Sequence, residues 1–211
     1  MGLININKHI EYFDPHSIKD SIHIIGCGAI GSHIGISLAR LGVSRIYLYD
    51  FDIVEDHNIA NQAYDQLDIG RPKTEALAKK MLLINPSARI KIKEKYTDQH
   101  LLGYVFLCVD NIETRRKIVE SNPQATFFDT RMGLEEGQSY AGPNLLSSMQ
   151  FTEDEAQVNQ PVSACNMTLS ILPLVWSITS ATVAQFINTV NNKPVQNAVF
   201  INAFKHITTT I

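Results

Sequence analysis

A glycine-rich loop follows an apolar segment near the start of the chain, and its spacing is typical of a nucleotide-binding turn. Gly26, Gly28 and Gly31 form a G-x-G-x-x-G pattern directly after the β-branched segment Ser21–Ile25 (SIHII). We expect Gly26 to allow a tight turn and Gly28 to let a phosphate or adenosine approach the backbone. Gly31 would let the following helix lie close to the strand.

The elements around this loop occur in the order that nucleotide binding requires. A helix is expected at about Ser32–Leu41, and a second strand, Arg45–Tyr49, ends at Asp50, twenty-four residues after Gly26. A carboxylate at that spacing accepts hydrogen bonds from ribose hydroxyls. Free N–H groups where the helix begins, at Ala29 and Ile30, attract an anion. Glycines also serve ordinary turns, but this order favours a nucleotide site without deciding which nucleotide.

Further polar residues follow Asp50 at fixed intervals, and a hydride-transfer site would not need them. The chain carries Asp52 and Val54, then Asn58 and Gln62, then Gly70 and Lys73, and later Asp110, Asn111 and Arg115. Each has an ordinary alternative when taken singly. Asp52 or Asn58 could cap a turn, Lys73 could be a surface charge where a helix starts, and Asp110 with Asn111 could cap the next helix.

Taken together, these residues resemble the ThiF/MoeB family of adenylating enzymes, relatives of the ubiquitin-activating enzymes. The family patterns D-x-D-x-V-x-x-x-N-L-x-R-Q, G-x-x-K and D-N-x-x-x-R align in order with Asp50–Gln62, Gly70–Lys73 and Asp110–Arg115. The resemblance is detailed over roughly Ser21–Arg115 and looser elsewhere. It implies that ATP and magnesium activate the C-terminal carboxylate of a small ubiquitin-like or sulfur-carrier protein, with a Gly-Gly tail, as an acyl-adenylate.

The resemblance also implies roles for the individual side chains. Asp50 would hold the ribose within the Asp50–Asp52 pair, and Lys73 would neutralise phosphate charge as a point cation. Asp110 would hold magnesium, because carboxylate oxygens suit a hard cation. Asn58 and Gln62 would orient the phosphates through their amides. Arg115 would help to position the loop that carries Asp110.

One departure from the family pattern concerns charge. The family usually has an arginine immediately before the glutamine, and this chain has Asn61 there. Adenylation moves negative charge onto the departing pyrophosphate, which preorganised cations stabilise. A second family arginine, in an N-terminal helix, is not evident, since residues 1–20 contain only Lys8 and Lys19 as cations. Arg71, two residues before Lys73, is a candidate for compensating these losses.

Cysteine usage is the second departure. The three cysteines, Cys27, Cys108 and Cys165, form no C-x-x-C pair, and the seven histidines are dispersed, so the zinc site common in this family is not expected. Cys27 and Cys108 are most simply small core residues. Cys165 occupies a place that resembles the family's mobile cysteine, where it would act in sulfur transfer or a covalent carrier link. The alternative is a buried or incidental thiol.

Composition bounds the class of protein. The 211 residues are 45% hydrophobic and 18% charged with a net charge of −3, which indicates a single domain, here an adenylation domain over residues 1–211. The mildly acidic balance without a dense basic run argues against nucleic acid as the main partner. Few cysteines and no signal peptide favour a cytoplasmic protein. The uncharged segment Met167–Asn192 is long, but Pro173 and several polar residues favour a buried helix or subunit contact over a membrane span. The family resemblance implies a homodimer.

A coarse secondary structure completes the prediction. After the first strand–helix–strand unit we expect two further helices and five further strands, the last two possibly antiparallel. These are helices at Lys73–Asn85 and Ile112–Asn122 and strands at Ile90–Glu94, Tyr104–Cys108, Thr126–Asp129, Gln138–Tyr140 and Val199–Phe204. Arg131 and Met132 follow the fifth strand at a sheet end where a substrate tail could pass, and the alternative is an ordinary turn. The alternation predicts a Rossmann-like, doubly wound, mostly parallel sheet with helices on both faces.

Three functions fit these observations. An ATP-dependent adenylyltransferase accounts for most of the residues. A family member that has lost catalysis and serves as a nucleotide- or partner-binding subunit accounts for Asn61. An NAD-dependent oxidoreductase rests on the glycine loop and Asp50 alone. Lys73 and Asp110 separate these functions, because magnesium-dependent ATP chemistry needs both and NAD binding needs neither.

Overall fold

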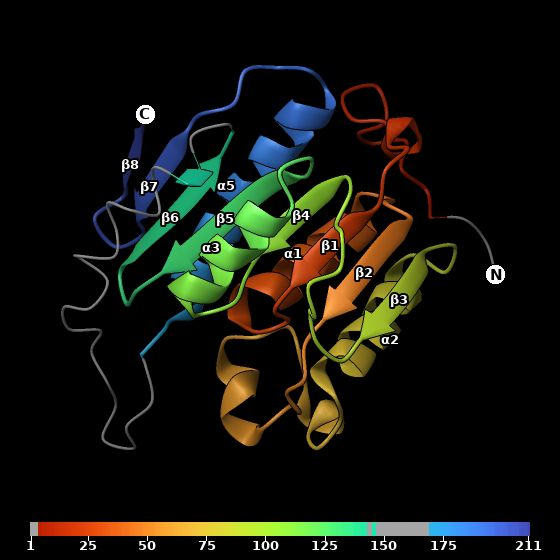
Figure 1. The fold of residues 1–211 in the computed structure, drawn as a ribbon. Coiled ribbons are helices and arrows are strands. Elements are labelled where there is room, and N and C mark those ends of the chain that lie inside the picture. Colours follow the sequence, from red (N-terminus) through yellow and green to blue (C-terminus); the bar gives the residue numbers. More distant parts are fainter. Residues whose placement is uncertain (1–3, 143–144, 147–168) are drawn as a thin grey trace.

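The computed structural model describes residues 4–142, 145–146 and 169–211, and their strands form one eight-stranded sheet (Figure 1). The strand order is β3-β2-β1-β4-β5-β6-β7-β8. Strands β1 to β5 pair in parallel, and β6, β7 and β8 pair antiparallel. The strands are β1 (Ile22–Ile25), β2 (Arg45–Tyr49), β3 (Arg89–Lys93), β4 (Tyr104–Leu107), β5 (Thr126–Met132), β6 (Glu136–Ala141), β7 (Ala198–Asn202) and β8 (Ile207–Thr210). The predicted mostly parallel sheet with late antiparallel strands is confirmed.

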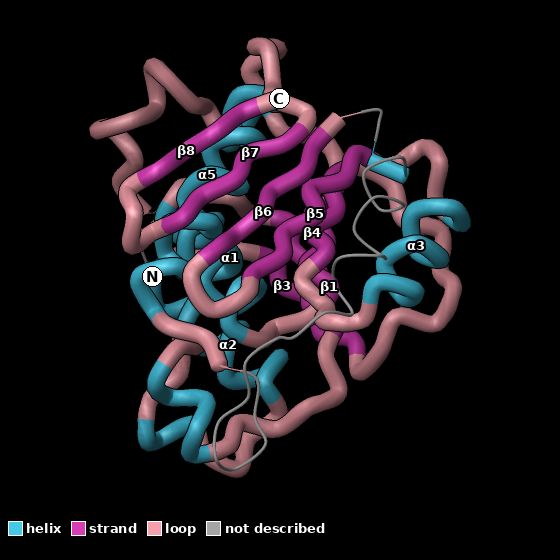
Figure 2. Tube along the Cα trace, turned by 90° about the vertical axis from the view of Figure 1, so that its left-hand side faces the viewer, coloured by secondary structure: helices cyan, strands magenta, loops and turns pink. Residues whose placement is uncertain are grey.

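Helices cover both faces of this sheet, as predicted. Figure 2 shows α1, α2 and α5 on one side of the strands and α3 on the other. Their bounds are α1 (Ala29–Arg40), α2 (Lys73–Ile84), α3 (Ile112–Ser121) and α5 (Leu172–Val190). Three short 3-10 helices complete the described elements: η1 (Pro15–Ser17), η2 (Asp56–Ala60) and η3 (Gln66–Asp68).

Each face of the sheet has its own hydrophobic core. The larger core joins α1, α2 and α5 to the sheet and includes the fully buried Ile34, Leu77, Phe106 and Phe186. The smaller core lies under α3 and contains Ile118. Helix α5 buries one face against the sheet, in agreement with the buried helix expected in this segment. In the described part of the chain, no helix is both long and apolar enough to cross a membrane.

The late strands differ most from the sequence prediction. Strand β5 continues to Met132 instead of ending at Asp129, so the alternative of an ordinary turn at Arg131 and Met132 is wrong. The reason is pairing, because Arg131 lies opposite Gln138, and Met132 opposite Gly137, in the antiparallel ladder with β6. Strand β8 was not predicted. It follows a turn that contains Phe204, which the prediction had placed in β7.

The strand order creates a switch point at which a ligand can bind. The chain leaves β1 toward β2 on one side, while β4 lies on the other side of β1. In open α/β sheets, ligands bind beyond the carboxyl ends of the strands at such a point. Figure 1 shows these ends at the lower edge of the sheet, with the segment between β2 and α2 beyond them.

Candidate functional site

The glycine loop joins β1 to α1 at this switch point. Gly26 has a φ of +94°, and a Cβ there would lie 2.7 Å from the carbonyl carbon of Cys108 at the end of β4. A Cβ on Gly31 would lie 1.8 Å from the carbonyl oxygen of Gly26. Gly26 therefore serves the turn and also the close approach of β1 to β4, and Gly31 allows the first turn of α1 to touch the loop.

Gly28 differs from these two glycines. A Cβ at Gly28 would meet no atom within 4 Å, so that side of the loop faces open space. Gly28 is also the N-cap residue of α1, with no side chain to satisfy the helix N–H groups. The packing of the described residues does not require this glycine, whereas a ligand close to the backbone would.

Asp50 bridges the two loops at the ends of β1 and β2. Its Oδ2 accepts a hydrogen bond of 2.6 Å from the Cys27 N–H, and its Oδ1 accepts one of 2.8 Å from the Asp52 N–H. Burial raises the pKa of Asp50, and the two N–H donors partly oppose that shift. A carboxylate oxygen can accept more than one hydrogen bond, so this arrangement leaves Asp50 able to bind a ribose hydroxyl.

Lys73 is a buried cation in a pocket beyond the end of β2. Its exposed fraction is 7%, and its Nζ forms an ion pair of 2.9 Å with Asp52 Oδ2. The two residues are also joined through the backbone, since the Lys73 N–H donates to the Asp52 carbonyl at 2.9 Å. The pocket has a volume of about 360 Å³, and its lining residues are Phe51, Asp52, Ile53, Glu55, His57, Asn58 and Lys73. An ammonium group in such a pocket suits a phosphate.

Tyr64 is a residue that the sequence reasoning missed. It is buried, and its hydroxyl donates to the Cys27 carbonyl at 2.7 Å and lies 3.2 Å from the Lys73 carbonyl. Burial raises the pKa of Tyr64, which keeps the hydroxyl protonated as a donor. Tyr64 thus ties the glycine loop to the start of α2. No local pattern identifies it, because its partners are far away in the sequence.

The two predicted amide residues have different surroundings. Asn58 lines the pocket, but its side-chain oxygen accepts from the Glu55 N–H at 2.9 Å and closes a capping box on η2. The capping role considered for Asn58 is therefore present alongside its place in the pocket. Gln62 has a buried Oε1 without a hydrogen-bond partner among the described residues. Such an atom is costly unless something pairs with it, which fits a ligand contact.

Asn61, which stands where the family usually has an arginine, and Arg71, the candidate for compensating its charge, both lie outside the pocket lining. The Asn61 side chain donates from Nδ2 to Ser170 Oγ, just before α5. Arg71 is exposed, and its Nε donates to the Leu67 carbonyl at 3.1 Å. The Arg71 backbone helps to shape the site, because its carbonyl accepts from the Val54 N–H at 2.8 Å. Compensation by the Arg71 guanidinium stays a prediction.

Asp110 follows β4 and lies at the carboxyl edge on the other side of the switch point. It is exposed, and the neighbouring Asn111 is the residue that caps α3, by accepting from the Thr114 N–H at 2.8 Å. Asp110 is therefore not needed as the cap. Magnesium is usually held by one or two carboxylates together with substrate phosphates and water, so a lone exposed carboxylate fits that ion. Among the described residues, no group of three or more His, Cys, Asp or Glu side chains could hold a metal by itself.

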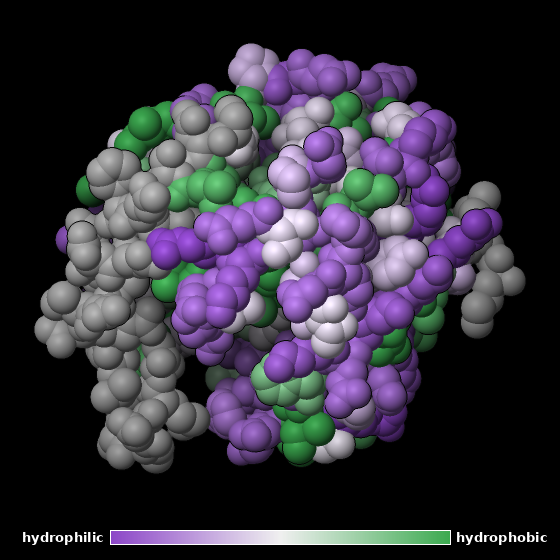
Figure 3. Space-filling view, viewed as in Figure 1, coloured by the Kyte–Doolittle hydropathy of each residue, from purple (hydrophilic) through white to green (hydrophobic). Residues whose placement is uncertain are grey.

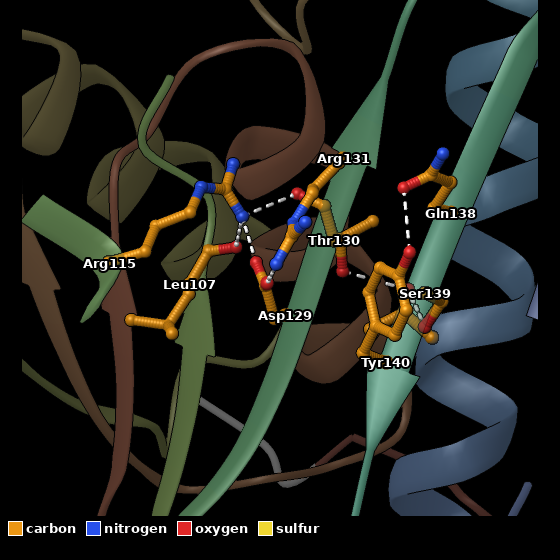
Figure 4. A network of polar contacts seen from close by, with 9 residues as sticks. Leu107, Arg115, Asp129, Thr130, Arg131, Gln138, Ser139 and Tyr140 are labelled. Carbon is orange, nitrogen blue, oxygen red and sulfur yellow. Dashed lines mark hydrogen bonds and ion pairs between the residues drawn. The ribbon is translucent and has the colours of Figure 1, made fainter. Parts of the chain in front are cut away.

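Arg115 anchors the end of β4 from inside the protein. Its Nη1 donates to the Leu107 carbonyl at 3.1 Å, to the Thr130 carbonyl at 2.9 Å and to Asp129 Oδ1. Arg131 holds the other oxygen of Asp129, through Nε at 2.8 Å and Nη2 at 2.5 Å. Figure 4 shows Asp129 between the two guanidinium groups. This buried network fixes the strand end from which Asp110 follows. The sequence predicts the positioning role of Arg115 and singles out Arg131 only as a residue at a sheet end, so the network around Asp129 is a finding of the structure.

Two of the three cysteines, Cys27 and Cys108, lie in the described part of the chain. Cys27 is fully buried, and burial raises the pKa of its thiol. Burial also raises the pKa of the Cys108 thiol to about 12. Both thiols therefore stay protonated at neutral pH. Cys27 is a core residue, and Cys108 is partly buried and packs against the core. Cys165 lies outside the described residues.

The geometry defines a Rossmann-like α/β protein with a glycine loop at the switch point of its sheet, and comparison with known proteins gives the family. The family model described as "ThiF family" matches residues 17–210. The chain belongs to the ThiF family.

Several known proteins are similar to the chain. It is 30% identical over 135 residues to ubiquitin-like modifier-activating enzyme 5 of Oryza sativa subsp. japonica, covering 54% of this chain and 30% of the relative. It is 29% identical over 131 residues to tRNA threonylcarbamoyladenosine dehydratase 2 of Saccharomyces cerevisiae, covering 55% of this chain and 29% of the relative. A crystal structure of E. coli MccB with ATP superposes with a TM-score of 0.73 at 16% identity, covering 93% of this chain and 65% of that one. The chain thus spans about a third of the length of these two curated relatives. At 16% identity, the structural likeness to MccB shows the fold alone.

Proposed function

We propose that this chain is an ATP- and magnesium-dependent adenylyltransferase that acts, as a homodimer, on a small ubiquitin-like or sulfur-carrier protein with a C-terminal Gly-Gly tail. The observation that carries the proposal is the buried Lys73 ammonium in a pocket at the carboxyl edge of the sheet, near the open glycine loop. Membership of the ThiF family supports it. Relatives named as ubiquitin-like modifier-activating enzyme 5 and adenylyltransferase/sulfurtransferase MoeZ support the class of substrate.

The proposed reaction transfers an adenylyl group to a carboxylate. A carboxylate oxygen of the carrier forms a bond to the α-phosphorus of ATP, the bond to the β-phosphate oxygen breaks, and pyrophosphate leaves. Lys73 would bind phosphate oxygens as charge moves to the pyrophosphate, and Asp50 would hold the ribose. Asp110 would hold the magnesium ion that neutralises phosphate charge. The backbone at Gly28 would let the nucleotide approach the start of α1.

Calorimetric titration with ATP and magnesium, beside titration with NAD, tests the nucleotide site. We expect ATP to bind and NAD not to bind, with weaker ATP binding in Lys73→Met and loss of the magnesium dependence in Asp110→Ala. Lys79→Met is the matched control, because Lys79 is an exposed lysine on the same helix. If ATP does not bind at millimolar concentration, or NAD binds more tightly than ATP, the proposal is wrong.

Gly28→Ala separates ligand contact from folding. The added methyl group meets no protein atom within 4 Å, so the free protein should lose only the difference between glycine and alanine as N-cap residues, below about 1 kcal/mol. A nucleotide lying against the loop would meet that methyl group, and we expect ATP affinity to decrease. Unchanged ATP affinity in this variant would place the nucleotide elsewhere.

A second function, a catalytically impaired family member that binds a nucleotide or partner, is favoured by one contact. The neutral Asn61 amide is bonded to Ser170 at the position where the family usually has a cation. Pyrophosphate release from ATP, measured with Gly-Gly-tailed carrier proteins, separates the two functions. If the parent binds ATP without releasing pyrophosphate, and Asn61→Arg restores the release, the catalytically impaired function is supported. Unchanged release in Arg71→Ala would remove Arg71 from the mechanism.

A further inference from the structure

One part of the sheet presents exposed cations on the same side as α3. The parallel register places Arg45 beside Arg89, Tyr47 beside Lys91, and Tyr49 beside Lys93, so their side chains share a face. Lys95 follows β3, which is an edge strand. We call Arg45, Arg89, Lys91, Lys93 and Lys95 the basic face; all five are exposed.

Within residues 89–95 the basic face has four cations beside one carboxylate, Glu94. None of the ion pairs found among the described residues includes any of these five cations. The whole chain has a net charge of −3, so this concentration of positive charge is local. In Figure 3, which has the viewpoint of Figure 1, hydrophilic side chains dominate the right-hand side, where β2 and β3 lie. A local cationic surface attracts an acidic partner.

The rings on this face favour an acidic polypeptide over a nucleic acid. The Tyr47 ring stacks on His23 at a centroid distance of 4.8 Å, and Lys91 Nζ lies 5.2 Å from its centroid. Lys95 Nζ lies over the Phe51 ring at 5.7 Å. Binding of single-stranded nucleic acid depends on open ring faces on which bases stack. Here lysines already lie over the rings, so the surface would bind a partner through charge and not through base stacking.

The basic face leads to the pocket that contains Lys73. Phe51, contacted by Lys95, is 69% exposed and lines that pocket. Lys93 is joined to the same loop, because its carbonyl accepts from the Asp50 N–H at 3.3 Å. A polypeptide lying along β3 would therefore have a short path from the basic face to the pocket.

We propose that the basic face binds an acidic surface of the polypeptide whose carboxylate enters the Lys73 pocket. This inference rests on the proposed adenylation function and names the charge of its substrate. A different explanation is that lysines on an edge strand prevent pairing with other chains. That explanation predicts no affinity for acidic polypeptides, so binding measurements separate the two.

Fluorescence anisotropy with two labelled probes, an oligoglutamate peptide and an oligouridylate of equal charge, tests the proposal. The variant is Lys91→Glu with Lys93→Glu, and the matched control is Lys8→Glu with Lys205→Glu, two exposed lysines outside the basic face. We expect the peptide to bind the parent and the control equally, and the variant about tenfold more weakly at low salt. If charge reversal disturbs folding, Lys91→Gln with Lys93→Gln should weaken binding by a smaller factor.

Two results would overturn the proposal. Equal peptide affinity in the parent and the Lys91/Lys93 variant would show that the basic face does not bind acidic polypeptides. Tighter binding of oligouridylate than of peptide, lost in the same variant, would identify a nucleic-acid surface instead. Calorimetry with ATP and magnesium on this variant keeps the two proposals distinct. ATP binding should be unchanged in it, whereas absence of ATP binding in the parent would refute the nucleotide site and not the docking surface.

Discussion

Replacing Asp129 by Asn should destabilise the protein more than replacing Arg115, one of the two arginines that contact it. Asp129 is fully buried, and the side chains of Arg115 and Arg131 that flank it are only 5% and 13% exposed. Asp129→Asn keeps the shape of the side chain but removes the buried negative charge that both guanidinium groups contact. Breaking a buried ion pair by removing one partner costs about 3–5 kcal/mol.

Arg115→Met should cost less, because Asp129 keeps a counterion. Arg131 continues to contact Asp129 Oδ2 through two nitrogens, at 2.8 and 2.5 Å. The loss is then that of the Arg115 hydrogen bonds to buried acceptors, about 1–3 kcal/mol. The expected order of destabilisation is therefore Asp129→Asn above Arg115→Met.

Urea unfolding at 25 °C and neutral pH measures both changes, with the slope against urea checked for two-state behaviour. In a chain of 211 residues, the larger change corresponds to a decrease in Tm of about 10 °C. Lys117→Met is the control, because its ion pair with Glu113 is at the surface and its loss should be within experimental error. A loss below about 1 kcal/mol for Asp129→Asn, or a larger loss for Arg115→Met, would refute the reasoning.

Three further predictions concern the site and the sheet. Tyr64→Phe should reduce ATP affinity and lower the free energy of unfolding by about 1–3 kcal/mol, since the Cys27 carbonyl loses its donor; unchanged values would exclude a positioning role. Burial raises the pKa of Asp50, and its protonated form accepts fewer hydrogen bonds from a ribose. As pH decreases, ATP affinity should therefore begin to fall at a pH above the usual pKa of an aspartate. Calorimetry across pH should show this dependence in the parent and not in Asp50→Asn. Burial lowers the pKa of His23 from 6.5, so as pH falls this side chain takes up a proton in the unfolded chain before it does so in the folded protein. Protonation therefore favours the unfolded chain, and Tm should decrease below about pH 6.5. His23→Gln should show a smaller decrease, and an equal one would contradict the assignment.

Local sequence signals are sufficient to predict the elements that build the candidate site. The strand Arg45–Tyr49 was predicted with both ends correct, because β-branched and aromatic residues end there at an aspartate. Helix α2 begins at Lys73 as predicted, directly after Pro72. The glycine spacing also gave the loop between β1 and α1, although the helix begins at Ala29, three residues before the predicted start.

Features that depend on long-range pairing could not be predicted in this way. Strand β5 extends to Met132 because β6 pairs with it, and β8 forms by pairing with β7. The contact of Tyr64 with Cys27 joins residues 37 positions apart, and Arg115 meets Asp129 across 14 positions. Propensity and periodicity report on neighbours in the sequence, so they carry no signal for such contacts.

The contacts among the described residues hold much of the site in place before any ligand binds. Asp50 ties the loop after β1 to the loop after β2, Asp52 ties that loop to α2, and Tyr64 ties α2 back to the glycine loop. These bonds form a closed circuit, which reduces the ordering that binding would otherwise require. Lys73 is the exception within the circuit, because its ammonium is already paired with Asp52. In the proposed reaction a phosphate would share Lys73 with that carboxylate or displace it, so Asp52 would limit nucleotide affinity at the same time as it positions the lysine.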